Sequence, residues 1–121
     1  MNIFHKKLRN AHFSLRALRG LLLEESSFQI QLTVALFVVF LGFYFNLSAL
    51  EWTLVILIIG IVLAIEALNT AIEELCDHVT PEEHPKIGIV KDTSAAASLL
   101  FGIASIIAGV LIFLPHIISA L

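Results

Sequence analysis

The chain has 121 residues, of which 59% are hydrophobic and 14% are charged, with a formal net charge of −3 and a mean hydropathy of +0.98. Soluble domains are about 45–50% apolar, so this composition predicts a membrane protein of one domain, residues 1–121. The acidic balance, without a strong basic cluster, excludes a nucleic-acid binder, and the single cysteine, Cys76, excludes an intrachain disulfide.

Residues 4–23 predict an amphipathic helix that lies in the membrane interface. Apolar side chains recur there at spacings of three and four, and five basic residues lie between them: Lys6, Lys7, Arg9, Arg16 and Arg19. Basic side chains on such a helix face lipid headgroups, whereas the alternative is a loosely ordered basic tail. The run Glu24-Glu25-Ser26-Ser27 then predicts a break, with a serine capping the next helix.

Three stretches, about 28–45, 51–79 and 92–114, are long and apolar enough to cross a membrane. The second helix is expected to continue beyond its apolar part, because the residues that follow contain neither proline nor glycine. Two prolines predict a loop over 80–86, and Pro115 is expected to end the third span. The predicted fold class is therefore an all-α membrane protein with a surface helix and three transmembrane helices.

Small residues share one face of the third span, and they predict close contact with the second span. This stripe comprises Lys91, Ala95, Ser98, Gly102, Ser105 and Gly109. Small side chains let helix backbones approach closely in lipid, where van der Waals contact drives packing.

The positions of the basic residues predict the orientation in the membrane. All seven lysines and arginines lie before the first span or between the second and third spans. The excess of such residues on the cytoplasmic side places the N-terminus in the cytoplasm and the C-terminus outside. The loop over 80–86 is then cytoplasmic.

Polar residues on one face of the second helix are the candidate site. At about 100° per residue, Glu66, Asn69, Thr70, Glu73 and Asp77 fall within about 100° of one another. Glu66 lies deepest among aliphatic residues, where desolvation disfavours its charge and suits it to taking a proton from a hydroxyl. The alternatives for this acid are an ion pair with the lysine of the third span and a simple position at the membrane interface.

The remaining polar groups predict a cation and phosphate site. Glu73 and Asp77, with Glu25 at the start of the first span, offer oxygen ligands for Mg²⁺, which favours one or two carboxylates with phosphates and water. Lys91 is suited to holding a phosphate as a point charge, and pairing with Asp92 or Glu73 is its alternative. A solvated helix end is the alternative for the acids.

These residues alone leave two functions open, an enzyme that acts on a membrane lipid and a cation- or proton-coupled transporter. A transporter needs a polar path to the other face of the membrane. The outer halves of the three spans contain almost no polar residues, which favours the enzyme.

The run Glu66-Ala-Leu-Asn69-Thr70-Ala-Ile-Glu73-x-x-x-Asp77 closely resembles the signature of the small bacterial integral-membrane lipid kinases, the diacylglycerol kinase and undecaprenol kinase family. The resemblance covers nearly the whole chain, including the basic start and the pair Lys91-Asp92. It implies an ATP-dependent lipid kinase of the bacterial inner membrane. It also implies a homotrimer whose sites are shared between neighbouring subunits.

The resemblance implies a role for each matching residue. Glu66 matches the general base on the lipid hydroxyl, and Glu25 and Glu73 match the acids that hold Mg²⁺ on the ATP phosphates. The implied nucleotide-binding residues are Asn69, Glu73, His84, Lys91 and Asp92, and the implied lipid-headgroup residues are Lys6, Arg9 and Arg19.

The lipid substrate is predicted from three local similarities. Glu51-Trp52, Asn69-Thr70-Ala71 and the proline-bearing loop resemble the undecaprenol kinase branch of the family more than the other branch. The predicted reaction is phosphorylation of undecaprenol to undecaprenyl phosphate, and the alternative acceptor is diacylglycerol.

Overall fold

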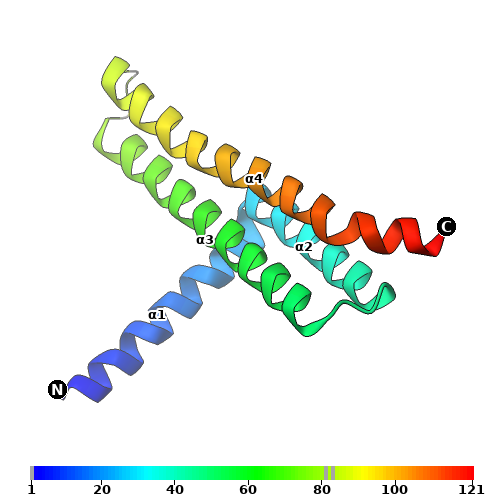
Figure 1. Cartoon of the computed structure of the whole chain (residues 1–121). Coiled ribbons are helices and arrows are strands. Elements are labelled where there is room, and N and C mark those ends of the chain that lie inside the picture. The colour runs from blue at the N-terminus through cyan, green and yellow to red at the C-terminus, as the bar shows by residue number, and fades with distance from the viewer. Residues whose placement is uncertain (1, 81, 83) are drawn as a thin grey trace.

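The computed structural model describes residues 2–80, 82 and 84–121, so Pro81 of the expected loop lies outside the described residues. The described residues form α1 (Ile3–Glu24), α2 (Ser26–Tyr44), α3 (Ala49–Val79) and α4 (Pro85–Ala120) (Figure 1). Helices α2, α3 and α4 are each long and apolar enough to cross a membrane. The prediction of one amphipathic helix followed by three helices of spanning length is confirmed.

Helix α1 projects away from the other helices and has no buried residue (Figure 1). It meets α2 at Glu25, whose extended backbone ends one helix and starts the next. The prediction of a serine cap is wrong, because Ser26 is already helical and Glu25 occupies the cap position without a side-chain hydrogen bond. The corner is held instead by Gln29, whose side-chain amide donates to the carbonyl of Leu22 at 3.0 Å.

The turn between α2 and α3 is fixed by its backbone and by a cap. Asn46 has a positive φ of 54°, a conformation that asparagine tolerates better than most residues. Ser48 then caps α3: its hydroxyl accepts from the backbone of Glu51, and the Glu51 carboxylate accepts from the backbone of Ser48. Glu51 also contacts the Nε2 atom of His116 at 2.8 Å, which joins the start of α3 to the end of α4.

The apolar core lies at this turn end of the molecule. Its buried members come from the turn, α3 and α4: Leu47, Val55, Ile112 and Phe113. Gly42 of α2 is also buried, and a Cβ atom there would lie 2.6 Å from the Cη2 atom of Trp52. The close approach of α2 to α3 at this end therefore depends on the absence of a side chain at position 42.

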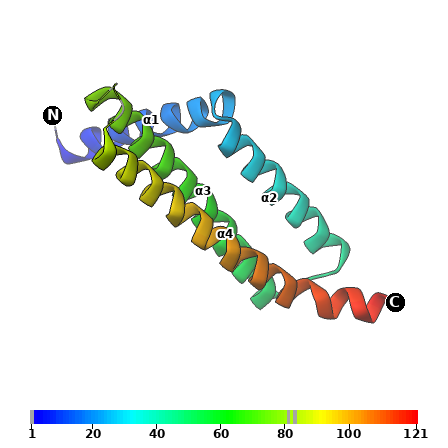
Figure 2. The ribbon, with the colours of Figure 1, turned by 90° about the horizontal axis from the view of Figure 1, so that it is seen from above.

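Helices α3 and α4 run side by side in opposite directions, and they contact each other more extensively than any other pair (Figures 1 and 2). The predicted contact along the small-residue stripe is confirmed for Ser98, Gly102, Ser105 and Gly109, which are partly buried. The predicted contact is wrong for Ala95, which is exposed. The packed face of α4 includes the preceding residue, Ser94, in place of Ala95. Helix α2 follows this pair at the turn end and diverges from it towards α1 (Figure 2).

Both predicted limits of the last helix are wrong. The expected loop over 80–86 is shorter, because α4 begins at Pro85, where proline lacks only an N–H that has no helical partner anyway, and His84 is the cap. The helix does not end at Pro115 but continues to Ala120. An interior proline removes one backbone hydrogen bond and kinks the helix, and the last part of α4 is angled to the rest in both views (Figures 1 and 2).

Candidate functional site

The polar face of α3 changes from buried to exposed along the helix. Glu66 is only 9% exposed, Asn69 and Glu73 are partly buried, and Asp77 is exposed. Glu66 and Glu73 are about 10 Å apart along the helix axis. One uninterrupted helix thus carries a mostly covered acidic residue, Glu66, and further acidic residues near its own end.

The buried acid of α3 has no polar partner within the part of the chain that the structure describes. No ion pair or hydrogen bond joins the Glu66 carboxylate to another described side chain, and the ion pair with Lys91 that the sequence allowed is not formed. Its carboxylate oxygens keep some accessible surface, because the one fully buried side-chain N or O atom without a partner among the described residues is the Oγ atom of Ser98. A ligand beside α3 could therefore reach the Glu66 carboxylate.

A chain of hydrogen bonds crosses from α4 to α3 next to this acid. The hydroxyl of Ser94 donates to the Oδ1 atom of Asn69 at 2.7 Å, and the Nδ2 atom of Asn69 donates to the Oε1 atom of Glu73 at 3.2 Å. All three side chains are partly buried. The orientation of the Asn69 amide is thereby set by a donor on one side and a carboxylate on the other.

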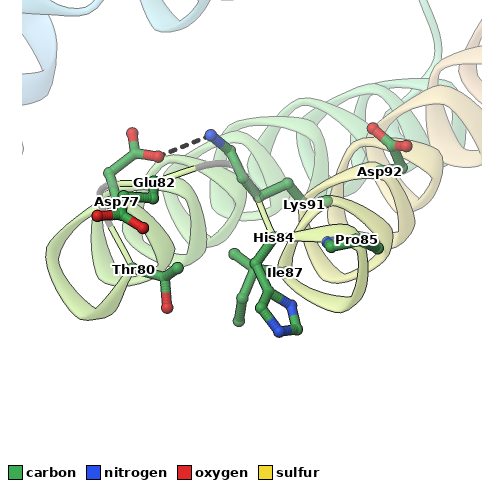
Figure 3. A pocket seen from close by; sticks show the side chains of 9 residues that line it. Asp77, Thr80, Glu82, His84, Pro85, Ile87, Lys91 and Asp92 are labelled. Atoms are coloured by element: carbon green, nitrogen blue, oxygen red, sulfur yellow. Dashed lines mark hydrogen bonds and ion pairs between the residues drawn. The ribbon is translucent and has the colours of Figure 1, made fainter.

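Lys91 of α4 forms the ion pair that ties the exposed ends of the two helices together. Its Nζ atom lies 2.7 Å from the Oδ1 atom of Asp77 (Figure 3). The pairing with Asp92 or Glu73 considered from the sequence is wrong, because the antiparallel packing of α3 and α4 brings Asp77 opposite the lysine. Asp77 is well exposed, so a ligand can reach this pair from solvent.

A pocket of about 560 Å³ opens at the α3–α4 loop end, and the ion pair forms part of its wall (Figure 3). Three residues predicted to bind the nucleotide line it: His84, Lys91 and Asp92. Its other lining residues are Asp77, Thr80, Glu82, Pro85, Ile87 and Gly88. The volume is that of an ordinary small-molecule site.

The charges of the described pocket wall restrict the ligands that the pocket could hold. Its described lining contains three carboxylates, on Asp77, Glu82 and Asp92, and one cation, Lys91. A bare polyphosphate would be repelled by such a wall. A polyphosphate that carries a divalent cation would be repelled less strongly, because the metal offsets negative charge on the ligand and on the wall.

The remaining predicted site residues lie elsewhere in the single chain. Glu25 lies at the α1–α2 junction, and Figures 1 and 2 both place this junction apart from the α3–α4 loop end. Lys6, Arg9 and Arg19 are exposed on α1 and form no ion pair with another described residue. One copy of the chain therefore does not bring the predicted lipid, metal and nucleotide residues together.

The carboxylates suit Mg²⁺ only with help from other ligands. Among the described residues there is no group of three or more His, Cys, Asp or Glu side chains placed to hold a metal ion. Mg²⁺ is commonly bound by one or two carboxylates with water and substrate phosphates. The partly buried oxygens of Glu73 fit this mode of binding, and a metal cage built by one chain does not.

Ser94 is the residue of this site that sequence reasoning missed. It lies beside the small-residue stripe but belongs to neither the signature run of α3 nor the Lys91-Asp92 pair. The pattern that points to it is its spacing: it follows Lys91 by three residues and precedes Ser98 by four, so the three share one side of a helix.

The chain is similar in sequence to a family of known proteins. The family model for prokaryotic diacylglycerol kinase matches residues 12–113. The chain is 41% identical over 93 residues to the undecaprenol kinase of Bacillus subtilis, covering 77% of this chain and 76% of that protein. It is 32% identical over 97 residues to the diacylglycerol kinase of Helicobacter pylori, covering 80% of this chain and 76% of that protein. It is 27% identical over 113 residues to the diacylglycerol kinase of Escherichia coli K12, covering 93% of each.

The chain therefore belongs to the prokaryotic diacylglycerol kinase family of membrane lipid kinases, which are ATP-dependent phosphotransferases.

Proposed function

We propose that this chain transfers the γ-phosphoryl group of ATP to undecaprenol at the cytoplasmic leaflet of the bacterial inner membrane. The observation that carries the choice of lipid is the 41% identity to an undecaprenol kinase, against 32% and 27% to the two diacylglycerol kinases. The distribution of basic residues supports the leaflet, because it puts the α3–α4 loop end in the cytoplasm, where ATP is found.

The nucleotide binds in the pocket at the α3–α4 loop end. Lys91 contacts its phosphates as a point charge, while His84 and Asp92 lie on the same pocket wall. Asp77 holds the lysine in place before the nucleotide arrives. Asn69 and Glu73 continue the polar surface from this pocket towards Glu66.

Glu66 takes the proton from the hydroxyl of the lipid as that oxygen attacks the γ-phosphorus of ATP, and the bond from this phosphorus to the β,γ-bridging oxygen breaks to release ADP. Its burial on the apolar part of α3 supports this role, because the lipid hydroxyl reaches that depth while its chain stays in the bilayer. Phosphoryl transfer depends mainly on in-line positioning and on neutralising charge. Lys91 supplies part of that charge, and a general base contributes typically about 10²- to 10⁴-fold.

Mg²⁺ is the proposed metal, with Glu73 and Glu25 as its protein ligands. When bound there it would neutralise charge on the phosphate oxygens. Within one chain Glu25 lies at the α1–α2 junction, away from the α3–α4 loop end (Figures 1 and 2). We therefore propose a homotrimer in which Glu25 of one subunit completes the site of its neighbour.

The basic face of α1 is the proposed contact with the lipid headgroup region. Lys6, Arg9 and Arg19 are exposed on a helix that packs against little else in the chain. Such a helix lies in the membrane surface with its basic side chains at the headgroups. This position brings an acceptor lipid to the level of the site.

A panel of lipid alcohols tests the proposed function. The purified protein in mixed micelles with Mg²⁺ and γ-labelled ATP is expected to phosphorylate undecaprenol in preference to diacylglycerol, because its sequence is closer to the undecaprenol kinase. Transfer to diacylglycerol alone would correct the acceptor and keep the chemistry. Transfer to no lipid alcohol would overturn the proposed function.

A further inference from the structure

We infer that Ser94 is a positioning residue for the metal and nucleotide site and acts through Asn69. The inference rests on the proposed function and extends it to a residue outside the signature run. Ser94 touches neither of the groups that would contact Mg²⁺ or the lipid directly. It contacts Asn69 from the opposite helix, at 2.7 Å.

In the hydrogen-bonded series Ser94–Asn69–Glu73, the direction of each hydrogen bond follows from the donor and acceptor groups of the side chains. The carboxylate of Glu73 can only accept, so the amide nitrogen of Asn69 must face it. The amide oxygen of Asn69 then faces Ser94, which must donate its hydroxyl proton. Ser94 thus anchors the Asn69 amide to α4 in the orientation that Glu73 selects.

Removing the hydroxyl would leave the amide oxygen of Asn69 without its donor. The amide would then be held only by its hydrogen bond to Glu73 and would no longer be anchored to α4. The position of the Glu73 carboxylate would be less well fixed as a result. Partners that orient a metal-binding carboxylate in this way typically change metal affinity by about 10- to 100-fold when they are removed, and a neutral hydrogen bond contributes less.

The location of Ser94 makes this contact a link between two helices. Ser94 lies one turn beyond Lys91 on the packed side of α4, and Lys91 holds Asp77. The two contacts fix α4 against α3 on either side of Glu73. Because Ser94 and Asn69 are both partly buried, their hydrogen bond is less exposed to competition from water than the ion pair is.

The test is binding of Mn²⁺ together with the β,γ-imido analogue of ATP, followed by the electron paramagnetic resonance signal of free Mn²⁺ in micelles. Ser94→Ala is expected to weaken Mn²⁺ binding by about 3- to 10-fold, since it removes one orienting hydrogen bond. Ser94→Thr keeps a hydroxyl and is expected to bind as the wild type does. Ser105→Ala is the matched control, because that hydroxyl bonds to the carbonyl of Phe101 in its own helix at 2.7 Å.

Two further measurements separate positioning from a general loss of structure. In steady-state assays Ser94→Ala is expected to raise the KM for Mg·ATP and leave the KM for the lipid unchanged. In an Asn69→Ala background, Ser94→Ala is expected to have no further effect. Wild-type Mn²⁺ binding in Ser94→Ala, or additive losses in the double variant, would overturn the inference, whereas a wild-type protein that phosphorylates no lipid would overturn the proposed function itself.

Discussion

Replacing Glu66 by glutamine is expected to lower kcat by about 10²-fold or more while the protein stays folded, as is typical for the loss of a general base. Glutamine has nearly the same size and shape as glutamate, so the packing around this buried position is preserved. It cannot accept the proton of the lipid hydroxyl. The measurement is turnover with saturating ATP and undecaprenol, alongside thermal unfolding of both proteins in the same detergent.

Glu74→Gln is the matched control for this experiment. Glu74 is on the same helix and undergoes the same chemical change, but its side chain is exposed. It is expected to retain wild-type turnover, which would show that removing a negative charge from α3 is harmless in itself. Near-normal turnover in Glu66→Gln would remove this residue from the chemical step.

Replacing Glu73 by glutamine is expected to raise the Mg²⁺ concentration needed for half-maximal activity by about tenfold or more. A neutral amide is a much weaker ligand for a hard cation than a carboxylate. The change should appear in a metal titration at fixed ATP, and activity should recover at high Mg²⁺. If the titration of Glu73→Gln overlays that of the wild type, Glu73 is a solvated residue and no metal ligand.

The helices could be predicted from the sequence because the local signals agree with one another. The expected ranges 4–23 and 51–79 differ little from Ile3–Glu24 and Ala49–Val79. Each is a long run with helical spacing or continuous apolarity and has no interior proline. The continuation of α3 beyond its apolar part followed from the same absence of helix breakers.

The prolines misled the prediction of α4 because their effect depends on position. Pro85 occupies the first turn, where its missing N–H leaves no hydrogen bond unmade. Pro115 lies close to the end of the helix, where the continuing apolar residues still favour helical structure in a membrane. The positions of the prolines in the sequence do not by themselves show whether a helix ends at each of them.

The contacts between helices could be predicted only in part. The small-residue stripe indicated that α3 and α4 pack together, but not their register, and so it did not identify Asp77 as the partner of Lys91. The same uncertainty about rotation put Ala95 on the packed face and left out Ser94. Glu25 and Glu73 lie on different parts of the single chain, and only the proposed homotrimer would bring them together.

The proposed function requires that the nucleotide binds at the α3–α4 loop end and that Glu66 acts only in the chemical step. Equilibrium binding of the β,γ-imido analogue of ATP with Mg²⁺ tests this most directly, measured for the wild type, Lys91→Ala and Glu66→Gln. We expect Lys91→Ala to weaken binding by about tenfold or more, because it removes the only cation in the described pocket wall. We expect Glu66→Gln to bind as tightly as the wild type. Unchanged binding in Lys91→Ala would contradict the account and place the nucleotide elsewhere on the protein.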